Sequence, residues 1–455
     1  MKTTVKKICL ALLCAVLTVA PLASCDKTNT ETDRDFSLSS LEAVDPNKIP
    51  ASSKEFSDVP PGTYTVLCHV PSGDLLAISG ESEDTVDREI YLRNAQLKDR
   101  YSIELKELTI TGSTVDFVRN STLSGLVRYD VASLTYGDAM LLTVSNSLCA
   151  LSELGGYYQN REMFSEDLSV GGKQYIEDFN IFAPRLDGTY ALALNRSLLK
   201  SDSLEESVAL LVTGGEWTYD TVHSFMRGKG TMGLTDGGID ALWCGGGIGF
   251  YENGTDGVPA YKVLEGKAKD VYSALKIVKD EGYLESTEAD GEDTFVKIAK
   301  KTLLTVGTVG QIRTAIEQGL DLAVLPMPKT EKADKYSSFV SPDALCTVVP
   351  AGDETKNSVA FALTGMLYEY DLDSALIRGF TALASESNLR EGEIFDIISS
   401  SRTFDLPALY DVGGLYDYLD SSLRFYLLPD AFVEGINDRA QTAVVAIEIM
   451  REGYN

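Results

Sequence analysis

Strand-like and helix-like segments alternate along most of the chain, and this pattern restricts it to an α/β fold. The stretch TYTVLCHV (63–70) is rich in β-branched and apolar residues, as expected of a strand, and REIYLRNAQLKDRY (88–101) carries apolar residues at helical spacing. SIELKELTI (102–110) then alternates as a second strand. A strand, a helix and a strand in this order predict a parallel pair joined by a right-handed crossover.

The alternation continues to about residue 352, and helices dominate from about Asn357 onward. A chain of 455 residues can bury a large core and normally divides into more than one domain. We therefore predict a multi-domain α/β protein. Further helices are predicted over 115–127, 139–154, 217–228 and 268–284, and further strands over 129–136, at the start of 188–199, within 296–316, and over 320–329 and 341–352.

The N-terminus has the layout of a secretory leader, with three lysines in its first seven residues and an almost wholly apolar run from Ile8 to Ala20. This run is shorter than the roughly 20 residues that span a bilayer. LASC, ending at Cys25, resembles the lipobox of bacterial lipoproteins. The resemblance implies removal of residues 1–24 and attachment of diacylglycerol to the Cys25 thiol. A plain signal peptide with an incidental cysteine is the alternative.

Residues 25–60 are expected to form a lipidated N-terminus and a flexible tether. They are rich in Ser, Thr, Asp, Glu and Pro and hold few aromatic residues, so they cannot bury enough apolar surface to fold alone. The formal net charge of the chain is −28, and removing the three leader lysines makes it −31. A surface this acidic argues against binding nucleic acid through a general basic patch.

The sequence shows no catalytic or metal-binding signature. It contains two histidines, His69 and His223, and no HExxH, GxSxG, P-loop or EF-hand spacing. GGGIG (245–249) does not fit GxGxxG and favours a flexible or tightly approached backbone. We predict no enzyme, no catalytic residue, no cofactor and no metal. Glycoside hydrolysis needs only two suitably placed carboxylates, so a carbohydrate-active hydrolase remains an alternative.

Four cysteines follow Cys25 and lie far apart, without a CxxC pair or a histidine nearby in the sequence. We expect buried free thiols, and one long-range disulfide is the alternative outside the cell. These cysteines are Cys68, Cys149, Cys244 and Cys346.

Several segments, in this order, resemble the family 1 extracellular solute-binding proteins of ABC importers, the clan of the maltose-binding proteins. They are YLRNAQLKDRYSIELKEL, YDVASLTYGDAM, IFAPRLDGTYALALNRSLL, GGEWTYDTVHSF, GFYENG and LAVLPMPK. The resemblance covers roughly residues 60–430. It implies two α/β lobes, built from residues 61–187 with 326–372 and from 188–325 with 373–455. The implied hinge lies near 184–190, 324–328 and 370–374.

The resemblance also implies ligand contacts on both lobes. On the first lobe these are Tyr136 and Asp138, just beyond a strand end, where ligands of α/β sheets are met. A tyrosine covering the core and a helix N-cap aspartate are the alternatives. On the second lobe, Thr235 and Asp236 match a loop that faces the ligand in the relatives, and a glycine-rich turn is the alternative.

Three further residues of the second lobe complete the expected site. Trp243 would offer a stacking face, although the segment also suits a helix packed in the interior. Gly307 would permit close approach of a ligand and Thr308 would add a hydroxyl contact. Trp217, at the start of its helix, is expected in the core, and Asp187 and Tyr190 suit either role.

The resemblance implies a monomeric receptor anchored by lipid on the extracytoplasmic face of the cell membrane. It would hold a carbohydrate, such as an oligosaccharide, between closing lobes and deliver it to the permease of an ABC importer. A receptor of the same fold for a polyamine or a peptide is the alternative, because fold does not fix ligand. No nucleic-acid partner is predicted.

Overall fold

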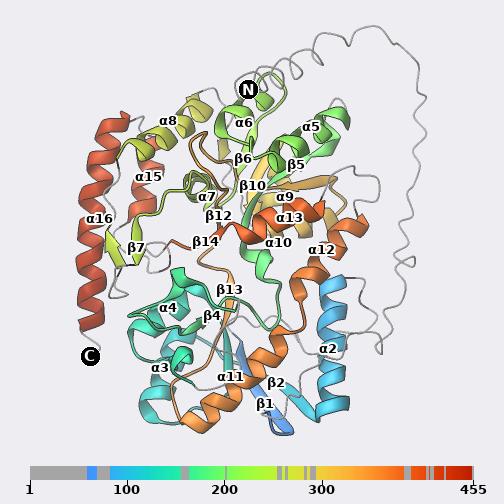
Figure 1. Cartoon of the computed structure of the whole chain (residues 1–455), viewed down its shortest axis with the longest axis vertical. Coiled ribbons are helices and arrows are strands. Elements are labelled where there is room, and N and C mark those ends of the chain that lie inside the picture. The colour runs from blue at the N-terminus through green and yellow to red at the C-terminus, as the bar shows by residue number, and fades with distance from the viewer. Residues whose placement is uncertain are drawn as a thin grey trace.

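A computed structural model describes residues 59–68, 82, 84–154, 163–199, 202–253, 259–261, 265–280, 284–286, 294–383, 391–405, 409, 414–424 and 427–452. The leader, Cys25, the tether as far as residue 58, and His69 lie outside these residues. The described chain forms two α/β lobes, each built on a five-stranded sheet (Figure 1). This architecture confirms the predicted fold class.

The sheet of the first lobe has the order β2-β1-β3-β13-β4. β1 pairs in parallel with β2 and with β3, whereas β13 pairs antiparallel with β3 and β4. Helix α2 connects β1 to β2, so the predicted strand–helix–strand unit is confirmed. The strands are β1 (Gly62–Cys68), β2 (Ile103–Thr109), β3 (Val131–Thr135), β4 (Ile176–Glu177) and β13 (Leu345–Val348), and the helices are α2 (Thr85–Tyr101), α3 (Thr114–Ser124), α4 (Tyr136–Val144) and α11 (Glu354–Tyr368).

The sheet of the second lobe has the order β11-β5-β10-β6-β9. β6 is parallel to β10, and β5 is antiparallel to both of its neighbours, β10 and β11. Its strands are β5 (Tyr190–Asn195), β6 (Met232–Leu234), β9 (Leu284–Ser286), β10 (Leu304–Thr308) and β11 (Leu322–Leu325). The helices are α5 (Asp202–Thr213), α6 (Tyr219–Met226), α7 (Gly238–Gly245), α8 (Gly266–Asp280), α9 (Thr294–Ala299), α10 (Val309–Glu317), α12 (Leu372–Leu383), α13 (Glu391–Ser400), α15 (Leu415–Arg424) and α16 (Pro429–Glu452).

The expected helix over 139–154 is shorter in the structure. α4 ends at Val144, and Asn146 then adopts a left-handed conformation with φ 53°. Such a conformation ends a helix. The chain next forms a β-bridge between Leu148 and Pro350, so tertiary pairing replaces the local helical preference.

The chain passes between the lobes at different places from those expected for the middle crossing. The first passage runs through the 3₁₀ turn η4 (Arg185–Gly188), between β4 and β5. Residues 326–339 still pack with the second lobe, because Met327 and Phe339 are buried in its core. The second passage therefore follows β12 (Ser338–Phe339) rather than residues 324–328, and a third joins α11 to α12.

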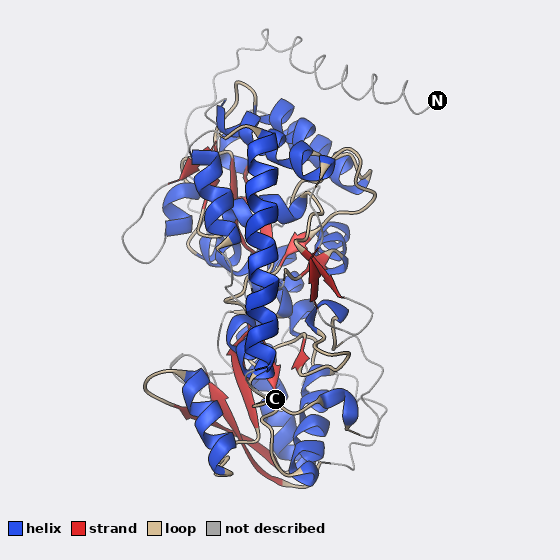
Figure 2. Cartoon of the chain, turned by 90° about the vertical axis from the view of Figure 1, so that its left-hand side faces the viewer, coloured by secondary structure: helices blue, strands red, loops and turns tan. Residues whose placement is uncertain are grey.

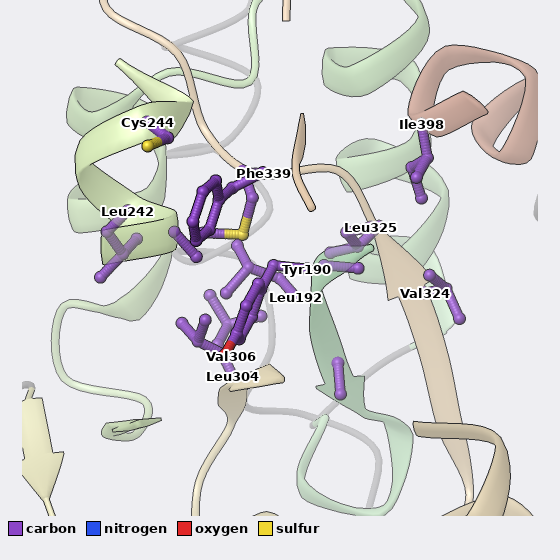
Figure 3. Packing of buried hydrophobic residues seen from close by; sticks show 14 of the residues in the cluster. Tyr190, Leu192, Leu242, Cys244, Leu304, Val306, Val324, Leu325, Phe339 and Ile398 are labelled. Carbon is purple, nitrogen blue, oxygen red and sulfur yellow. The ribbon is translucent and has the colours of Figure 1, made fainter. Parts of the chain in front are cut away.

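A buried apolar core fills the second lobe and extends to the lobe junction. Leu192, Leu304 and Val306 of the sheet lie beside Tyr190 and Phe339, whose rings stack with centroids 5.8 Å apart (Figure 3). Figure 2 shows the lobes one above the other, with the C-terminal helix α16 running from the second toward the first. The four cysteines within the described residues are free thiols, as expected. Among the described helices, none is long and apolar enough to cross a membrane.

Candidate functional site

The second lobe gathers four predicted residues at one edge of its sheet. β6 and β10 are parallel, with Leu234 opposite Val306, so their carboxyl ends meet at the same edge. The register of β5 places Tyr190 opposite Thr308 at this edge. Thr235 and Asp236 follow β6 directly, while Gly307 and Thr308 end β10. The sheet thus brings together residues that lie about 70 positions apart in the sequence.

Tyr190 fixes the loop that carries Asp236. Its hydroxyl donates to the Asp236 carbonyl at 2.7 Å, and the Thr235 hydroxyl donates to the Val306 carbonyl at 2.9 Å. Gly237 has φ 70°, and a Cβ there would lie 2.2 Å from the Tyr190 hydroxyl oxygen. These contacts fix the backbone at Asp236, whose side chain is exposed to solvent.

Gly307 and Thr308 have structural partners of their own. A Cβ on Gly307 would come within 2.5 Å of the Phe295 ring, so this glycine allows close packing of α9 on the sheet. Thr308 caps α10: its backbone N–H donates to Gln311 Oε1 at 2.9 Å, and its Oγ1 accepts from the Gln311 N–H at 3.3 Å. Thr308 is nevertheless partly exposed at the edge.

Trp243 lies inside the second lobe. Its ring is fully buried, stacks on Phe250 at 5.8 Å and meets Phe432 edge-on at 5.4 Å. The packing follows the interior alternative, and in this arrangement the ring has no exposed face for a ligand. Trp217 is also fully buried, and its Nε1 donates to the Pro326 carbonyl at 3.1 Å.

On the first lobe, β3 ends where α4 begins. The Thr135 Oγ1 accepts from the Asp138 N–H at 3.1 Å and so caps the helix, which places the partly exposed Asp138 in the first turn. Tyr136 points inward and is 1% exposed. Its hydroxyl donates to Asp178 Oδ1 at 2.6 Å, and its ring centroid lies 4.9 Å from that of Phe404. Tyr136 therefore shapes this edge through Asp178 and Phe404.

Sequence reasoning missed a group of residues at the lobe junction. Arg402 Nη1 donates to Asp178 Oδ2 at 2.6 Å, and Asp405 accepts from the Tyr416 hydroxyl. Arg402 and Asp178 are 224 positions apart, so no local pattern could have paired them. Asp187, whose role the sequence left open, lies in the first passage between the lobes and forms an ion pair with Arg313 at 2.9 Å.

Burial shifts the pKa of three groups near the lobe junction. Burial raises the pKa of Asp405 to about 7. Burial likewise raises the pKa of Asp240 to about 7, and the charges of Asp420 and Asp417 add to this shift. Burial and the charge of Asp178 also raise the pKa of Tyr136, so its hydroxyl stays protonated and can act as a donor.

Within the part of the chain that the structure describes, no group of His, Cys, Asp and Glu side chains is arranged to hold a metal ion. The two sheet edges carry carboxylates and hydroxyls. The carboxylates can accept hydrogen bonds from a polar organic ligand, and the hydroxyls can accept or donate them.

Comparison with solved structures shows what this arrangement resembles. The lacto-N-biose complex of the galacto-N-biose/lacto-N-biose I-binding protein of a Bifidobacterium longum ABC transporter aligns with a TM-score of 0.56 at 14% identity, covering 85% of this chain and 98% of that one. This chain has the fold of an ABC-transporter substrate-binding protein. The GacH receptor of Streptomyces glaucescens, solved unliganded and with acarbose, aligns at a TM-score of 0.52 and 13% identity, covering 84% and 98%.

A third structure with this fold is an ABC substrate-binding protein of Listeria monocytogenes in complex with cycloalternan, at a TM-score of 0.52, 11% identity and coverage of 84% and 98%. No protein-family model and no curated protein matches the sequence. The likeness to substrate-binding proteins is thus one of fold, carried by nearly the whole length of each structure.

Proposed function

We propose that this protein is the solute receptor of an ABC importer, anchored through Cys25 on the extracytoplasmic face of the membrane, and that it captures a carbohydrate between its lobes. The observation that carries the proposal is the likeness in fold to three binding proteins described in complex with acarbose, cycloalternan and lacto-N-biose. The protein is proposed to bind its solute without altering it and to pass it to a permease.

The two sheet edges suggest how capture would work. Asp138 on the first lobe and Asp236 and Thr308 on the second are partly or fully exposed and can accept hydrogen bonds from sugar hydroxyls. A solute that bonds to both lobes gains contacts only when they approach each other, so it favours the closed state by its greater affinity for that state. Thr235 and Tyr190 would hold the Asp236 loop in position. A lipid anchor would keep the receptor near the permease.

A cationic solute such as a polyamine is a second candidate, favoured by the exposed carboxylates near Tyr190. Asp236 and Asp343 are exposed; burial raises the pKa of the Tyr190 hydroxyl, and the nearby charges of Asp240, Asp343 and Asp236 add to this shift. A polyamine would neutralise such charges, whereas a neutral sugar would use them as hydrogen-bond acceptors. The two candidates therefore differ in salt dependence, because only the cation should bind more weakly as ionic strength rises.

A thermal-shift and calorimetry screen tests the proposal, using maltotriose, lacto-N-biose, spermidine and a mixed tripeptide. A solute at 100 times its Kd should stabilise the native state by about 2.7 kcal/mol. Alanine at Asp138, Asp236 or Thr308 should then weaken binding by about fivefold or more, since one lost hydrogen bond costs on the order of 1 kcal/mol. Asp334→Ala, in an exposed loop, is the control and should bind as the wild type does.

Small-angle scattering measures closure in the same samples. A sugar that binds should reduce the radius of gyration, because two lobes joined by short passages rotate as rigid bodies. Tight binding of a sugar with no contraction, and with all three alanine variants at wild-type affinity, would place the site elsewhere. Binding of spermidine alone would replace the carbohydrate proposal by the polyamine one.

A further inference from the structure

Residues 401–405, here called the strap, belong to the second lobe by sequence but contact both lobes, through β12 of the second and Tyr136 of the first. The strap follows α13 and precedes α15, and both helices place leucine or isoleucine side chains in the second core. Yet the Phe404 ring packs on Tyr136 of the first lobe, and Leu409, a little beyond the strap, is buried in a first-lobe cluster. The strap therefore touches the same edge as the proposed solute contacts.

The strap is held along one side by backbone hydrogen bonds. Its two-residue strand β14 (Arg402–Thr403) pairs in parallel with β12, which precedes the second passage between the lobes. The Ser338 N–H donates to the Ser401 carbonyl at 2.7 Å, and the Val340 N–H donates to the Thr403 carbonyl at 3.0 Å. Such a short ladder holds few bonds, so a side-chain anchor is needed to keep it ordered.

Arg402 supplies that anchor. Its side chain is 4% exposed; Nη1 donates to Asp178 Oδ2 at 2.6 Å, and Nε donates to Thr189 Oγ1 at 3.1 Å. Asp178 also accepts from the Tyr136 hydroxyl through its other oxygen. One guanidinium thus joins the strap to the end of β4, to the first passage between the lobes and, through Asp178, to Tyr136. Arg185, 3.9 Å from Asp178, is a second cation beside this carboxylate.

We propose that Arg402 is a positioning residue for the solute site: it fixes the strap so that Phe404, Asp405 and the Tyr136 edge are ordered before a solute arrives. The inference rests on the proposed function. A wall ordered in advance spares the solute the entropy loss of ordering it on binding, so loss of the anchor weakens binding of every solute that uses this wall.

The two hydrogen bonds of Arg402 depend on the planar shape of its guanidinium group. Lysine carries a single ammonium group, which can keep the charge beside Asp178 but cannot bond Asp178 and Thr189 with the fixed fork geometry of a guanidinium. Arg402→Lys should therefore restore part of the order that Arg402→Met removes. Thr189→Val removes only the hydrogen bond from Arg402 Nε and keeps the side-chain shape, so it should have a milder effect than Arg402→Met.

Amide hydrogen exchange on the whole protein tests the anchor without any solute. In Arg402→Met the amides of Ser338 and Val340 should exchange at least tenfold faster than in the wild type, with a smaller increase in Arg402→Lys and Thr189→Val. The control is Leu97→Ala, which removes buried side-chain volume in α2, within a first-lobe cluster that holds no residue of the strap or of β12. It should lower Tm while leaving both amides as protected as in the wild type. Unchanged protection in Arg402→Met would overturn the proposal.

Binding gives the second readout, with any sugar from maltotriose and lacto-N-biose that binds the wild type. Arg402→Met should weaken that affinity at least tenfold, whereas Leu97→Ala should leave it unchanged. An equal loss of sugar affinity in the two variants would show that Arg402 only stabilises the fold, and would overturn the positioning role. If neither sugar binds the wild type, the carbohydrate proposal fails, and the exchange data by themselves decide whether Arg402 orders the strap.

Discussion

Glu177 offers a sharp test of the electrostatics of the first lobe. It lies at the end of β4 with no exposed surface, and its Oε1 accepts a hydrogen bond from the Thr364 hydroxyl at 2.6 Å. Oε2 has no hydrogen-bond partner among the described residues. Burial raises the pKa of Glu177 from 4.5 to about 8, against the opposing effect of the Thr364 hydrogen bond. The carboxyl is therefore protonated in the folded protein near neutral pH.

The sign of the pH effect follows from proton binding. Between pH 4.5 and about 8 the folded protein holds the Glu177 proton and the unfolded chain does not, so the free energy of unfolding falls as pH rises. Each pH unit in this window costs up to about 1.4 kcal/mol, and the full window costs up to about 5 kcal/mol. Below pH 4.5 both states are protonated, and above pH 8 both are ionised, so the effect levels off on both sides.

Glu177→Gln should remove this dependence, because an amide does not titrate over the range. Its Oε1 can still accept from Thr364, and the Thr347 hydroxyl lies opposite in the β13–β4 register, also without a partner in the described structure. Near pH 5 the variant and the wild type should unfold at similar urea concentrations. Near pH 8 the variant should be more stable by several kcal/mol.

Urea unfolding followed by tryptophan fluorescence, repeated from pH 5 to pH 8, measures the difference. Glu331→Gln, at an exposed position, is the control and should track the wild type at every pH. The acids Asp240 and Asp405 remain in all three proteins, so their contribution cancels in the comparison. Wild-type and Glu177→Gln curves that stay parallel across the range would show that Glu177 titrates alike in the folded and unfolded states, contrary to this reasoning.

Three further outcomes are expected. Gly237→Ala should break the Tyr190–Asp236 hydrogen bond and destabilise the protein by about 1–3 kcal/mol in urea, more than Gly112→Ala, where φ is also positive but no atom lies within 4 Å. Cys25→Ser should take up no fatty-acid label in cells, because serine has no thiol to form the thioether; labelled mutant would disprove the lipobox interpretation. A sugar that stabilises the protein should be recovered intact by chromatography after long incubation, and cleavage proportional to protein would favour the hydrolase alternative.

The local sequence was sufficient to predict those helices and strands whose apolar periodicity matches the face that they bury. The strand, helix and strand from 62 to 109 follow the predicted order within a few residues, because each buries a face that its spacing already defines. The core position of Trp217 likewise follows from its place at the start of a helix. The helix caps differ from the expectation, because Thr135 rather than Asp138 caps α4, and Thr308 also caps α10. The lipobox is also a local signal, which the described residues do not reach.

The tertiary structure decided which segments, far apart in the sequence, lie side by side. Periodicity shows which face a strand buries but not its neighbour, so only the register of β6 and β10 brings Asp236 and Thr308 to one edge. Packing also placed Trp243 in the interior, ended α4 early and kept residues 326–339 in the second lobe. The Arg402–Asp178 pair joins positions 224 residues apart, and its energy depends on burial and geometry that exist only once both lobes have folded.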